Sequence, residues 1–388
     1  MNLFYSEQQN NFREEVRTWM QANVPTRALP SLDTREGFEE HRQWEQQLAG
    51  GNWSMVTWPK AYGGRGCNLI EWLIFEEEYY RAGAPLRVNQ NGIFLLGPTL
   101  MEYGSDEQKT RYLSRMASGE EMWAQAWSEP NAGSDMAAIR TRAVREGEEY
   151  VIDGQKTWST RAVFADWAFC LLRSEAGSTR HHGLSFILVP LSAEGVTVRP
   201  IRQLNGLPGF AEIFFDEVRV PVFNRIGEEG QGWRIAMATA GFERGLMLRS
   251  PARFQETARR LVELYRHGND ELVDPAIQDA VLRCYLDAEA YTLSTYQTAS
   301  KLESGNSIGP EASCNKIFWS ELDLQMHYTA ISLLGARSEI LPDNDELIAE
   351  LGNWMEDFVH SHAGPIYAGT NEIQRNIISE RVLGMPRQ

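Results

Sequence analysis

A short segment near one third of the chain groups the residue types that bind flat or phosphorylated ligands. It runs QAWSEPNAGSD over residues 125–135. Its small residues and its glycine let the backbone come close to a ligand, and they leave N–H groups and two hydroxyls for a phosphate or a heterocycle. Taken alone, the segment is better interpreted as a turn between a helix and a strand.

A second segment, GQKTWST at residues 154–160, follows about 25 residues later. Trp158 lies at the end of an expected strand, with the hydroxyl of Thr160 two residues on. A tryptophan in this position can stack on a flat ring while the hydroxyl bonds the ring edge. Alone, Trp158 is better interpreted as a half-buried aromatic residue of a sheet.

A third segment, PIYAGTNEIQRN at residues 365–376, contains a glycine turn followed by a helix start. Thr370 is the expected N-cap, and a helix N-terminus favours an anionic group. An ordinary capped helix explains this segment equally well. The three segments together are harder to explain by chance.

The elements that must position these segments fall into three regions with different periodicity. Up to about residue 120, apolar residues recur every three or four positions, as in Phe12, Val16 and Met20, and predict helices. Between about 121 and 225 the period is two, with a hairpin turn at 146–148. From Gly232 onward long amphipathic stretches predict an antiparallel bundle. The expected helices are 6–20, 36–48, 69–82, 92–103, 106–117, 233–266, 275–303, 311–334 and 345–360, with a last helix from Asn371; the strands after the hairpin are 167–172, 184–189, 196–201 and 211–220.

Composition excludes several classes of function. A net charge of −16 over 388 residues disfavours nucleic acid or an anionic membrane as the main partner. The four cysteines form no CxxC pair and the seven histidines no HExxH spacing, so we expect no disulfide framework and no metal site. No apolar signal core follows Met1, and no apolar run is long enough to span a bilayer. We expect a cytoplasmic protein.

Over nearly its whole length the sequence resembles the acyl-CoA dehydrogenases. The hallmarks are WPKAYGGRG, WSEPNAGSD, GQKTWST, GFERG and YAGTNEIQRNIISERVLG, in this order and spacing. The resemblance implies an α+β multidomain fold. It has an N-terminal helical domain (1–120), a middle β-barrel-like domain (121–230) and a C-terminal four-helix bundle (231–388).

The resemblance also implies FAD as the cofactor and an acyl-CoA as the substrate. Trp127 and Ser128 match positions that bond the pyrimidine side of the flavin. Trp158 matches a residue that lies against the isoalloxazine, and Thr160 one that donates toward N5. Gly133 and Ser134 match the loop near the FAD phosphates and the thioester. Thr370 and Asn371 match the segment near the adenosine-diphosphate half of FAD.

The reaction implied by the resemblance introduces an α,β double bond into the thioester. A base removes an α-proton while a hydride leaves the β-carbon for flavin N5, and negative charge develops on the thioester oxygen. In the family a backbone N–H at the position of Ala368 donates to that oxygen, as does a flavin ribityl hydroxyl. The expected electron acceptor is an electron-transfer flavoprotein or a similar protein.

The chain departs from many relatives at the base. They carry a glutamate immediately before the Gly-Thr pair, where this chain has Ala368. Other relatives carry the glutamate on a helix of the C-terminal bundle, before an arginine, and Glu243 followed by Arg244 matches that position. Apolar neighbours on the helix would raise the pKa of Glu243 toward that of a general base. Arg244 would contact coenzyme A or steady Glu243. The alternative is an exposed helix glutamate in a surface ion pair with Arg244.

A second departure concerns the partner subunit. The arginine that reaches a neighbour's FAD pyrophosphate is normally followed by Phe-Gly, whereas residues 266–270 are RHGND, and the later glycine-rich segment is altered to LLGAR at 333–337. We therefore expect either a homo-oligomer or a mixed tetramer with a homologous chain. Two other functions stay open: a cofactor-sharing or non-catalytic subunit, and an oxygen-reactive flavin oxidase of the same fold.

Overall fold

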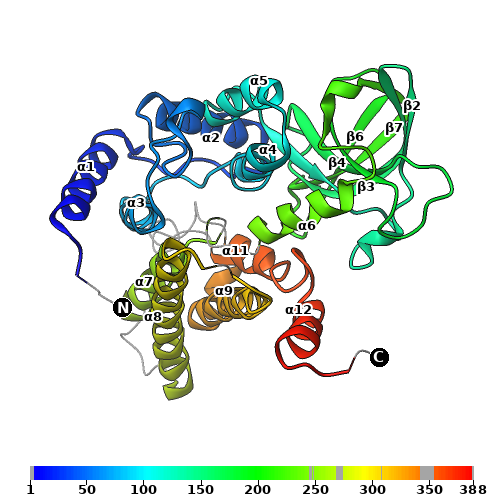
Figure 1. The fold of residues 1–388 in the computed structure, drawn as a ribbon. Coiled ribbons are helices and arrows are strands. Elements are labelled where there is room, and N and C mark those ends of the chain that lie inside the picture. Colours follow the sequence, from blue (N-terminus) through cyan, green and yellow to red (C-terminus); the bar gives the residue numbers. More distant parts are fainter. Residues whose placement is uncertain are drawn as a thin grey trace. The chain divides into compact units, whose positions relative to one another are not determined.

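The computed structural model describes residues 4–243, 247, 249–267, 274–306, 308–340 and 354–386. These residues form two compact units, which we call the sheet unit (25–67 and 85–243) and the helical unit (1–24, 68–84 and 244–388). Each unit is assembled from separate stretches of the chain, as the colours of Figure 1 show. The first two helices of the helical unit thus come from the N-terminal part of the sequence.

An eight-stranded sheet forms the centre of the sheet unit. Its order is β6-β7-β3-β2-β4-β5-β8, with β1 paired to β4, and β1–β4 and β2–β4 are its parallel pairs. The path is open, because it begins at β6 and ends at β8, so a central sheet is confirmed but its closure into a barrel is not. The strands are β1 (Trp123–Ala126), β2 (Arg142–Glu146), β3 (Glu149–Thr160), β4 (Trp167–Arg173), β5 (Leu184–Pro190), β6 (Val196–Ile201), β7 (Phe210–Pro221) and β8 (Arg225–Ile226).

The expected period of two is seen in β6 and most of β7, whereas β4 and β5 are buried on both faces. In β3, Tyr150 and Ile152 are fully buried on one face and pack with Cys170, Ile187 and Val218. Full burial of one such aliphatic side chain stabilises a fold by about 1.5–3 kcal/mol. The expected hairpin turn at 146–148 is confirmed by the antiparallel pairing of Glu146 with Glu149.

In the sequence of the sheet unit, helices come before and after the strands, with two short helical turns between them. Ser105 accepts a hydrogen bond from the N–H of Gln108 and caps α5, which confirms the expected N-cap. The expected helix 92–103 is a π-helical turn, η2, followed by α4. The helices are α2 (Arg35–Gly50), η1 (Lys60–Tyr62), η2 (Asn91–Leu96), α4 (Gly97–Tyr103), α5 (Asp106–Ala117), η3 (Met136–Ala138), η4 (Val222–Asn224) and α6 (Gly232–Glu243).

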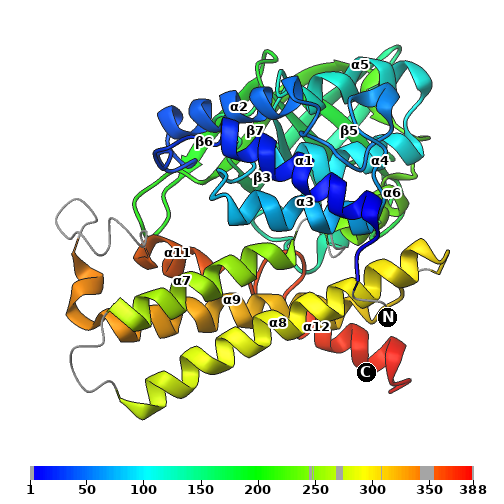
Figure 2. The same cartoon turned by 90° about the vertical axis from the view of Figure 1, so that its left-hand side faces the viewer.

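The helical unit packs three long helices side by side, α7, α8 and α9 (Figure 2). Their shared core contains Phe254, Tyr291 and Trp319. The C-terminal part is therefore helical as expected, but a four-helix arrangement is not confirmed. The helices are α1 (Glu7–Asn23), α3 (Leu69–Arg81), α7 (Pro251–His267), α8 (Pro275–Glu303), α9 (Ala312–Leu334), η5 (Gly335–Glu339), α11 (Trp354–Ser361), α12 (Asn371–Ile377) and η7 (Ile378–Val382).

One expected helix is wrong. The stretch 233–266 is two helices, α6 and α7, because the described residues Met247, Arg249 and Ser250 are not helical and α7 begins at Pro251. Pro251 has no N–H to bond the preceding turn, and a proline disfavours helical geometry at the residue before it, here Ser250. The apolar periodicity continues across this break, which is why the sequence alone suggested one helix. The expected helix 345–360 is described only from Trp354, and residues 345–353 lie outside the described part. Among the described helices, none is both long and apolar enough to cross a membrane.

Candidate functional site

The first predicted segment follows directly from β1. Trp127 is buried and Ser128 half-buried, and the Ser128 carbonyl accepts a hydrogen bond from the Thr157 N–H of β3 at 2.9 Å. Glu129 and Ala132 then bridge each other by two backbone hydrogen bonds of 3.0 Å. Gly133 is exposed beyond this turn, as is Ser134. The segment is thus a tight loop fixed at its base and open at its tip.

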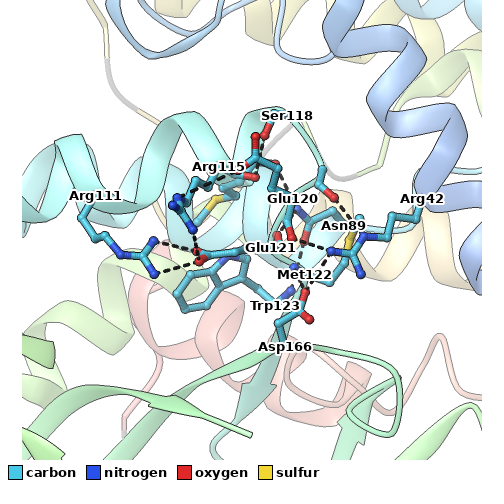
Figure 3. A network of polar contacts seen from close by, with 12 residues as sticks. Arg42, Asn89, Arg111, Arg115, Ser118, Glu120, Glu121, Met122, Trp123 and Asp166 are labelled. Atoms are coloured by element: carbon cyan, nitrogen blue, oxygen red, sulfur yellow. Dashed lines mark hydrogen bonds and ion pairs between the residues drawn. The ribbon is translucent and has the colours of Figure 1, made fainter. Parts of the chain in front are cut away.

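The entry to β1 is fixed by buried polar groups, drawn in Figure 3. Asn89 is 1% exposed; its oxygen accepts from the Trp123 N–H at 3.2 Å, while its amide donates to the carbonyls of Met116 and Glu121. The Asp166 carboxylate accepts from the Met122 N–H at 2.8 Å. Both ends of the α5-to-β1 connection are therefore tied within the sheet unit, which fixes where β1 delivers Trp127.

A buried lysine holds the base of the loop. Lys156 of β3 is 0% exposed, and its ammonium donates to the carbonyls of Trp127 (3.0 Å) and Leu171 (2.7 Å) and to the Glu129 carboxylate (2.8 Å). An ammonium has three N–H donors, so all three are used. The Glu129 carboxylate also accepts from the backbone N–H groups of Arg140 (2.7 Å) and Thr141 (2.9 Å).

The charges of this pair are set by burial and by each other. Burial raises the pKa of Glu129, but the charge and hydrogen bond of Lys156 and the bonds from Thr141 and Arg140 outweigh it, so its pKa lies below the ordinary value. Burial lowers the pKa of Lys156, and Glu129 opposes that shift. Burial also raises the pKa of the neighbouring Cys170 thiol to about 12, which keeps it neutral.

Trp158 lies in a bulge of the β3–β7 pairing. Lys156 pairs with Ile213 and Ser159 with Ala211, so two residues of β3 oppose one of β7. Trp158 has φ +59°, and its side chain is 60% exposed, with an edge contact to Phe210 at 6.0 Å between ring centroids. Positive φ is uncommon for a bulky residue and concentrates at functional sites. The bulge turns a large aromatic ring out of the sheet, which contradicts a merely half-buried sheet aromatic.

Two buried polar atoms lie in the first two predicted segments, one on Trp127 after β1 and one on Ser159 next to Trp158. Within the described residues, neither the Trp127 indole N–H nor the Ser159 hydroxyl has a hydrogen-bond partner. Thr160, two residues after Trp158, is half-buried at the end of β3. Buried polar groups are normally bonded, and a polar ligand would satisfy these two atoms. The described residues hold other such atoms as well, among them the indole N–H groups of Trp72, Trp123 and Trp354.

A second set of predicted residues lies in the helical unit. Ala368 has φ +59° and Gly369 φ +79°, and the Gln374 amide donates to both of their carbonyls, at 3.0 and 3.3 Å. No acceptor for the Ala368 N–H is found among the described residues. The preceding Tyr367 stacks on Trp319 at 6.0 Å between ring centroids. The loop thus holds its carbonyls inward and leaves one backbone donor for a ligand.

Thr370 and Asn371 differ in what they can offer. Thr370 caps α12, as predicted, by accepting from the Ile373 N–H at 3.2 Å. Asn371 is 3% exposed, and its carbonyl oxygen accepts from the buried Lys316 ammonium at 2.7 Å and the Ser320 hydroxyl at 3.2 Å. The side chain of Asn371 therefore holds the segment in place from inside.

The predicted base is placed only in part. Glu243 is the last described residue of α6, and its side chain lies outside the described part, as does all of Arg244. On the same helix Ala236, Thr239 and Ala240 are buried. The two segments that depart from the family pattern for the FAD pyrophosphate are 266–270 and 333–337. In the first, Arg266 and His267 are the last described residues of α7, and 268–270 lie outside the described residues. In the second, Gly335 to Arg337 begin η5.

A pocket of about 280 Å³ adjoins the first loop. It contains the polar residues Asn131 and Gln155 and lies in the sheet unit. The part of the chain that the structure describes has no group of three or more His, Cys, Asp or Glu side chains suited to a metal ion. The pocket residues are Glu129, Pro130, Asn131, Ala132, Ala138, Arg140, Thr141, Gly154 and Gln155.

Sequence reasoning missed the Lys156–Glu129 pair, although both residues lie inside the segments it singled out. The available signal was the period of two in β3. Tyr150, Ile152 and Lys156 are an even number of residues apart in the strand, which places Lys156 on the face of two buried residues, where a lysine is rarely found unless it is paired.

Comparison with known proteins identifies the family of this chain. Family models for the N-terminal, middle and C-terminal domains of acyl-CoA dehydrogenase match residues 6–120, 124–218 and 230–383. The acyl-CoA dehydrogenase IpdE1 of Mycobacterium tuberculosis is 39% identical over 97% of this chain and 98% of its own.

Two similar solved structures are complexes of two different chains by their titles. The Tcur3481-Tcur3483 steroid acyl-CoA dehydrogenase has a TM-score of 0.86 at 29% identity, and the ChsE4-ChsE5 complex of Mycobacterium tuberculosis has 0.83 at 31%; each match covers 100% of both chains. This chain therefore belongs to the acyl-CoA dehydrogenases, a family of flavoprotein oxidoreductases.

Proposed function

We propose that this chain binds FAD and oxidises an acyl-CoA thioester to its α,β-unsaturated form. The observation that carries the proposal is the outward-turned ring of Trp158, held at φ +59° by a bulge and 60% exposed. Apart from its edge contact with Phe210, such an exposed ring contributes little to the packing of the protein. An exposed aromatic ring on a rigid strand is instead suited to stacking on a planar ligand.

The residues around Trp158 fit a flavin. The Trp127 N–H can donate a hydrogen bond, and the Ser159 hydroxyl can donate or accept one; neither has a partner among the described residues. The carbonyls and nitrogens of a flavin ring could bond to both groups. We assign Trp127 and Ser128 to the pyrimidine side, Trp158 to the ring face and Thr160 to a bond toward N5. Gly133 and Ser134 lie at the exposed tip of the loop, which suits the FAD phosphates and the thioester.

FAD, when bound, accepts the hydride that leaves the β-carbon. The chain itself must take the α-proton, and we assign this step to the carboxylate of Glu243. Arg244 is assigned to coenzyme A or to steadying Glu243. Many relatives carry the base immediately before the Gly-Thr pair, and this chain has Ala368 at that position. No carboxylate there competes with Glu243 for the role of base.

The backbone N–H of Ala368 is assigned to the thioester oxygen. Its lack of an acceptor among the described residues supports this role, as does the anchoring of the Ala368 and Gly369 carbonyls by Gln374. A donor that is already oriented stabilises developing negative charge without reorganisation. Thr370 is assigned to the adenosine-diphosphate half of FAD, and Asn371 acts there by fixing the segment to α9.

The relatives suggest a bulky substrate and a second subunit. One similar solved structure is titled a steroid acyl-CoA dehydrogenase, and two are complexes of two chains. We propose that this chain acts on a bulky, steroid-derived acyl-CoA and passes electrons to an electron-transfer flavoprotein. Three finer points about this chain stay predictions. They are the domain bounds 1–120, 121–230 and 231–388, the barrel-like middle domain with a C-terminal four-helix bundle, and a cytoplasmic location.

A cofactor-sharing subunit is the second candidate function. The two-chain complexes at 29% and 31% identity favour it, together with the altered pyrophosphate segments around residues 266–270 and 333–337. An oxygen-reactive oxidase stays a prediction without an observation of its own.

The visible spectrum of the purified protein tests the proposal. We expect flavin absorption bands, release of FAD on denaturation, and bleaching of the bands by a suitable acyl-CoA under anaerobic conditions. The chain should be prepared alone and after co-expression with a homologous partner. A protein that stays colourless in both preparations and takes up no FAD on reconstitution contradicts the proposal.

A further inference from the structure

We infer that Lys156 and Glu129 are positioning residues that hold the flavin-binding loop in its binding conformation before the cofactor arrives. The inference rests on the proposed function, because it concerns the loop that carries Trp127 and Ser128. It adds two residues that have no role in the proposed chemistry, and it assigns them a measurable effect on cofactor affinity.

The geometry of Lys156 is that of a three-way connector. Its ammonium joins the end of β1 through the Trp127 carbonyl, the loop through the Glu129 carboxylate and β4 through the Leu171 carbonyl. Lys156 also lies two residues before Trp158 on β3. One fully buried cation therefore links the loop to the strand that carries the exposed ring.

Glu129 extends the connection across the loop. Its two carboxylate oxygens accept from the N–H groups of Thr141 and Arg140, just before β2. Thr141 in turn donates its hydroxyl to the Gln155 carbonyl of β3 at 3.0 Å. The loop is thus closed on both sides, and its conformation depends on a carboxylate and an ammonium that are both charged.

A buried pair of this kind is a costly way to gain stability alone. Removing two charges from water is unfavourable, and apolar replacements of a buried pair are often neutral or stabilising. The contacts made here are mostly to backbone groups, at Trp127 within the loop and at Arg140, Thr141 and Leu171 beside it, so what the pair specifies is the path of the backbone. A pre-organised loop binds its ligand more tightly because less ordering remains to be done.

Three variants separate positioning from general stability. Lys156→Met removes the ammonium, Glu129→Gln removes one charge, and the double variant removes both charges. The matched control is Glu78→Gln, a buried glutamate of the helical unit, which accepts from Arg13 at 2.8 Å and from Arg17 at 2.9 Å. Each protein is measured in its assembled form for FAD affinity, for thermal unfolding of the apoprotein and for amide exchange of residues 125–135.

We expect Lys156→Met and Glu129→Gln to weaken FAD binding on the order of tenfold and to speed amide exchange of the loop. Glu78→Gln should lower the unfolding temperature without either effect. The double variant should recover unfolding temperature relative to Lys156→Met, because no unpaired charge stays buried, but it should not recover FAD affinity.

Unchanged FAD affinity in both single variants, or recovery of affinity and stability together in the double variant, overturns the inference. Failure of the proposed function has a different signature, because then the wild-type chain binds no FAD in any preparation.

Discussion

The hydroxyl groups of Thr99 and Thr239 lie 2.8 Å apart, and both residues are fully buried. Thr99 belongs to α4 and Thr239 to α6, so the contact ties the helix that ends at Glu243 to the helices of the sheet unit. Each hydroxyl also lies within hydrogen-bond distance of the carbonyl four residues earlier, Leu95 or Ile235. Because a hydroxyl has one proton, one threonine donates to the other while its partner donates to the backbone.

Replacing Thr239 by Val should therefore destabilise the protein modestly. Valine keeps the shape of the side chain, and the loss is one buried hydrogen bond, about 1 kcal/mol in the free energy of unfolding. Thr99→Val should cost a similar amount, and the double variant less than the two losses added, because the same bond is lost once. Urea unfolding of the four proteins measures this coupling, and strict additivity would show that the hydroxyls do not interact.

Glu243→Gln should abolish thioester-dependent bleaching of the flavin while FAD stays bound. Glutamine keeps the size of the side chain but cannot accept the α-proton, and loss of a general base typically costs about 10²–10⁴ in rate. Stopped-flow reduction by an acyl-CoA measures the rate. Glu372→Gln is the control, because Glu372 is exposed at the start of α12. Wild-type turnover in the Glu243 variant would show that the base lies elsewhere.

Trp158→Ala should weaken FAD retention or shift the flavin spectrum, whereas Trp158→Phe should retain part of the affinity because it keeps an aromatic face. Neither change should alter the unfolding of the apoprotein by more than about 0.5 kcal/mol, since exposed side chains contribute little to stability. FAD titration of the apoprotein and its thermal unfolding separate the two effects. Equal FAD affinity in wild type and Trp158→Ala would exclude stacking on this ring.

The parts of the fold that the sequence predicted are those set by local patterns. The N-caps Ser105 and Thr370 and the hairpin at 146–148 follow from residue type and short-range spacing, and they are confirmed. The break before Pro251 was missed because apolar periodicity continued through it. The positive φ of Trp158 could not be predicted, because it depends on the pairing of β3 with a strand some fifty residues away.

The candidate site was predicted from motifs, but its supporting contacts were not. Lys156 and Glu129 lie in the quoted motifs, yet their three-way connection depends on Leu171 of β4 and on Thr141, which only the folded sheet brings near. Asn371 was predicted to contact the cofactor, and its burial against Lys316 could not be seen without knowing where α9 packs. Residue roles at this level require tertiary structure.

Stability below pH 4.5 should depend on Glu78 of α3. Burial raises the pKa of this carboxyl, but hydrogen bonds from Arg17 and Arg13 and the charge of Arg81 outweigh it, so its pKa lies below the ordinary value of 4.5. A carboxyl with a lowered folded-state pKa contributes stability that is complete above the unfolded-state value and is lost as the pH falls through the folded-state value.

Glu78→Gln should therefore cost on the order of 1–3 kcal/mol at pH 7 and flatten the loss of stability below pH 4.5. Unfolding free energies between about pH 3 and pH 7, from roughly one unit below to about three units above the ordinary carboxyl pKa, measure the difference. Glu14→Gln is the control, since Glu14 makes an exposed pair with the same Arg17. Parallel pH curves for wild type and Glu78→Gln would contradict the assignment.

Assembly is the last prediction, and it follows from the apolar face of α8. Leu282, Leu286 and Leu293 are 55%, 56% and 46% exposed on one helix of the described chain, and Tyr285 lies between them. Contiguous apolar exposure of this kind marks an interface in a protein with a charge of −16. We expect a dimer or tetramer, and the replacement of both Leu282 and Leu286 by Glu should shift it to smaller species. Leu204→Glu is the control, because Leu204 is 89% exposed in the sheet unit.

Mass measurement alongside the FAD-to-chain ratio then distinguishes a homo-oligomer from a mixed tetramer. One FAD per chain in a homo-oligomer excludes a required partner, half occupancy on co-expression with a homologue supports a cofactor-sharing tetramer, and a stable monomer with full FAD contradicts the interface altogether.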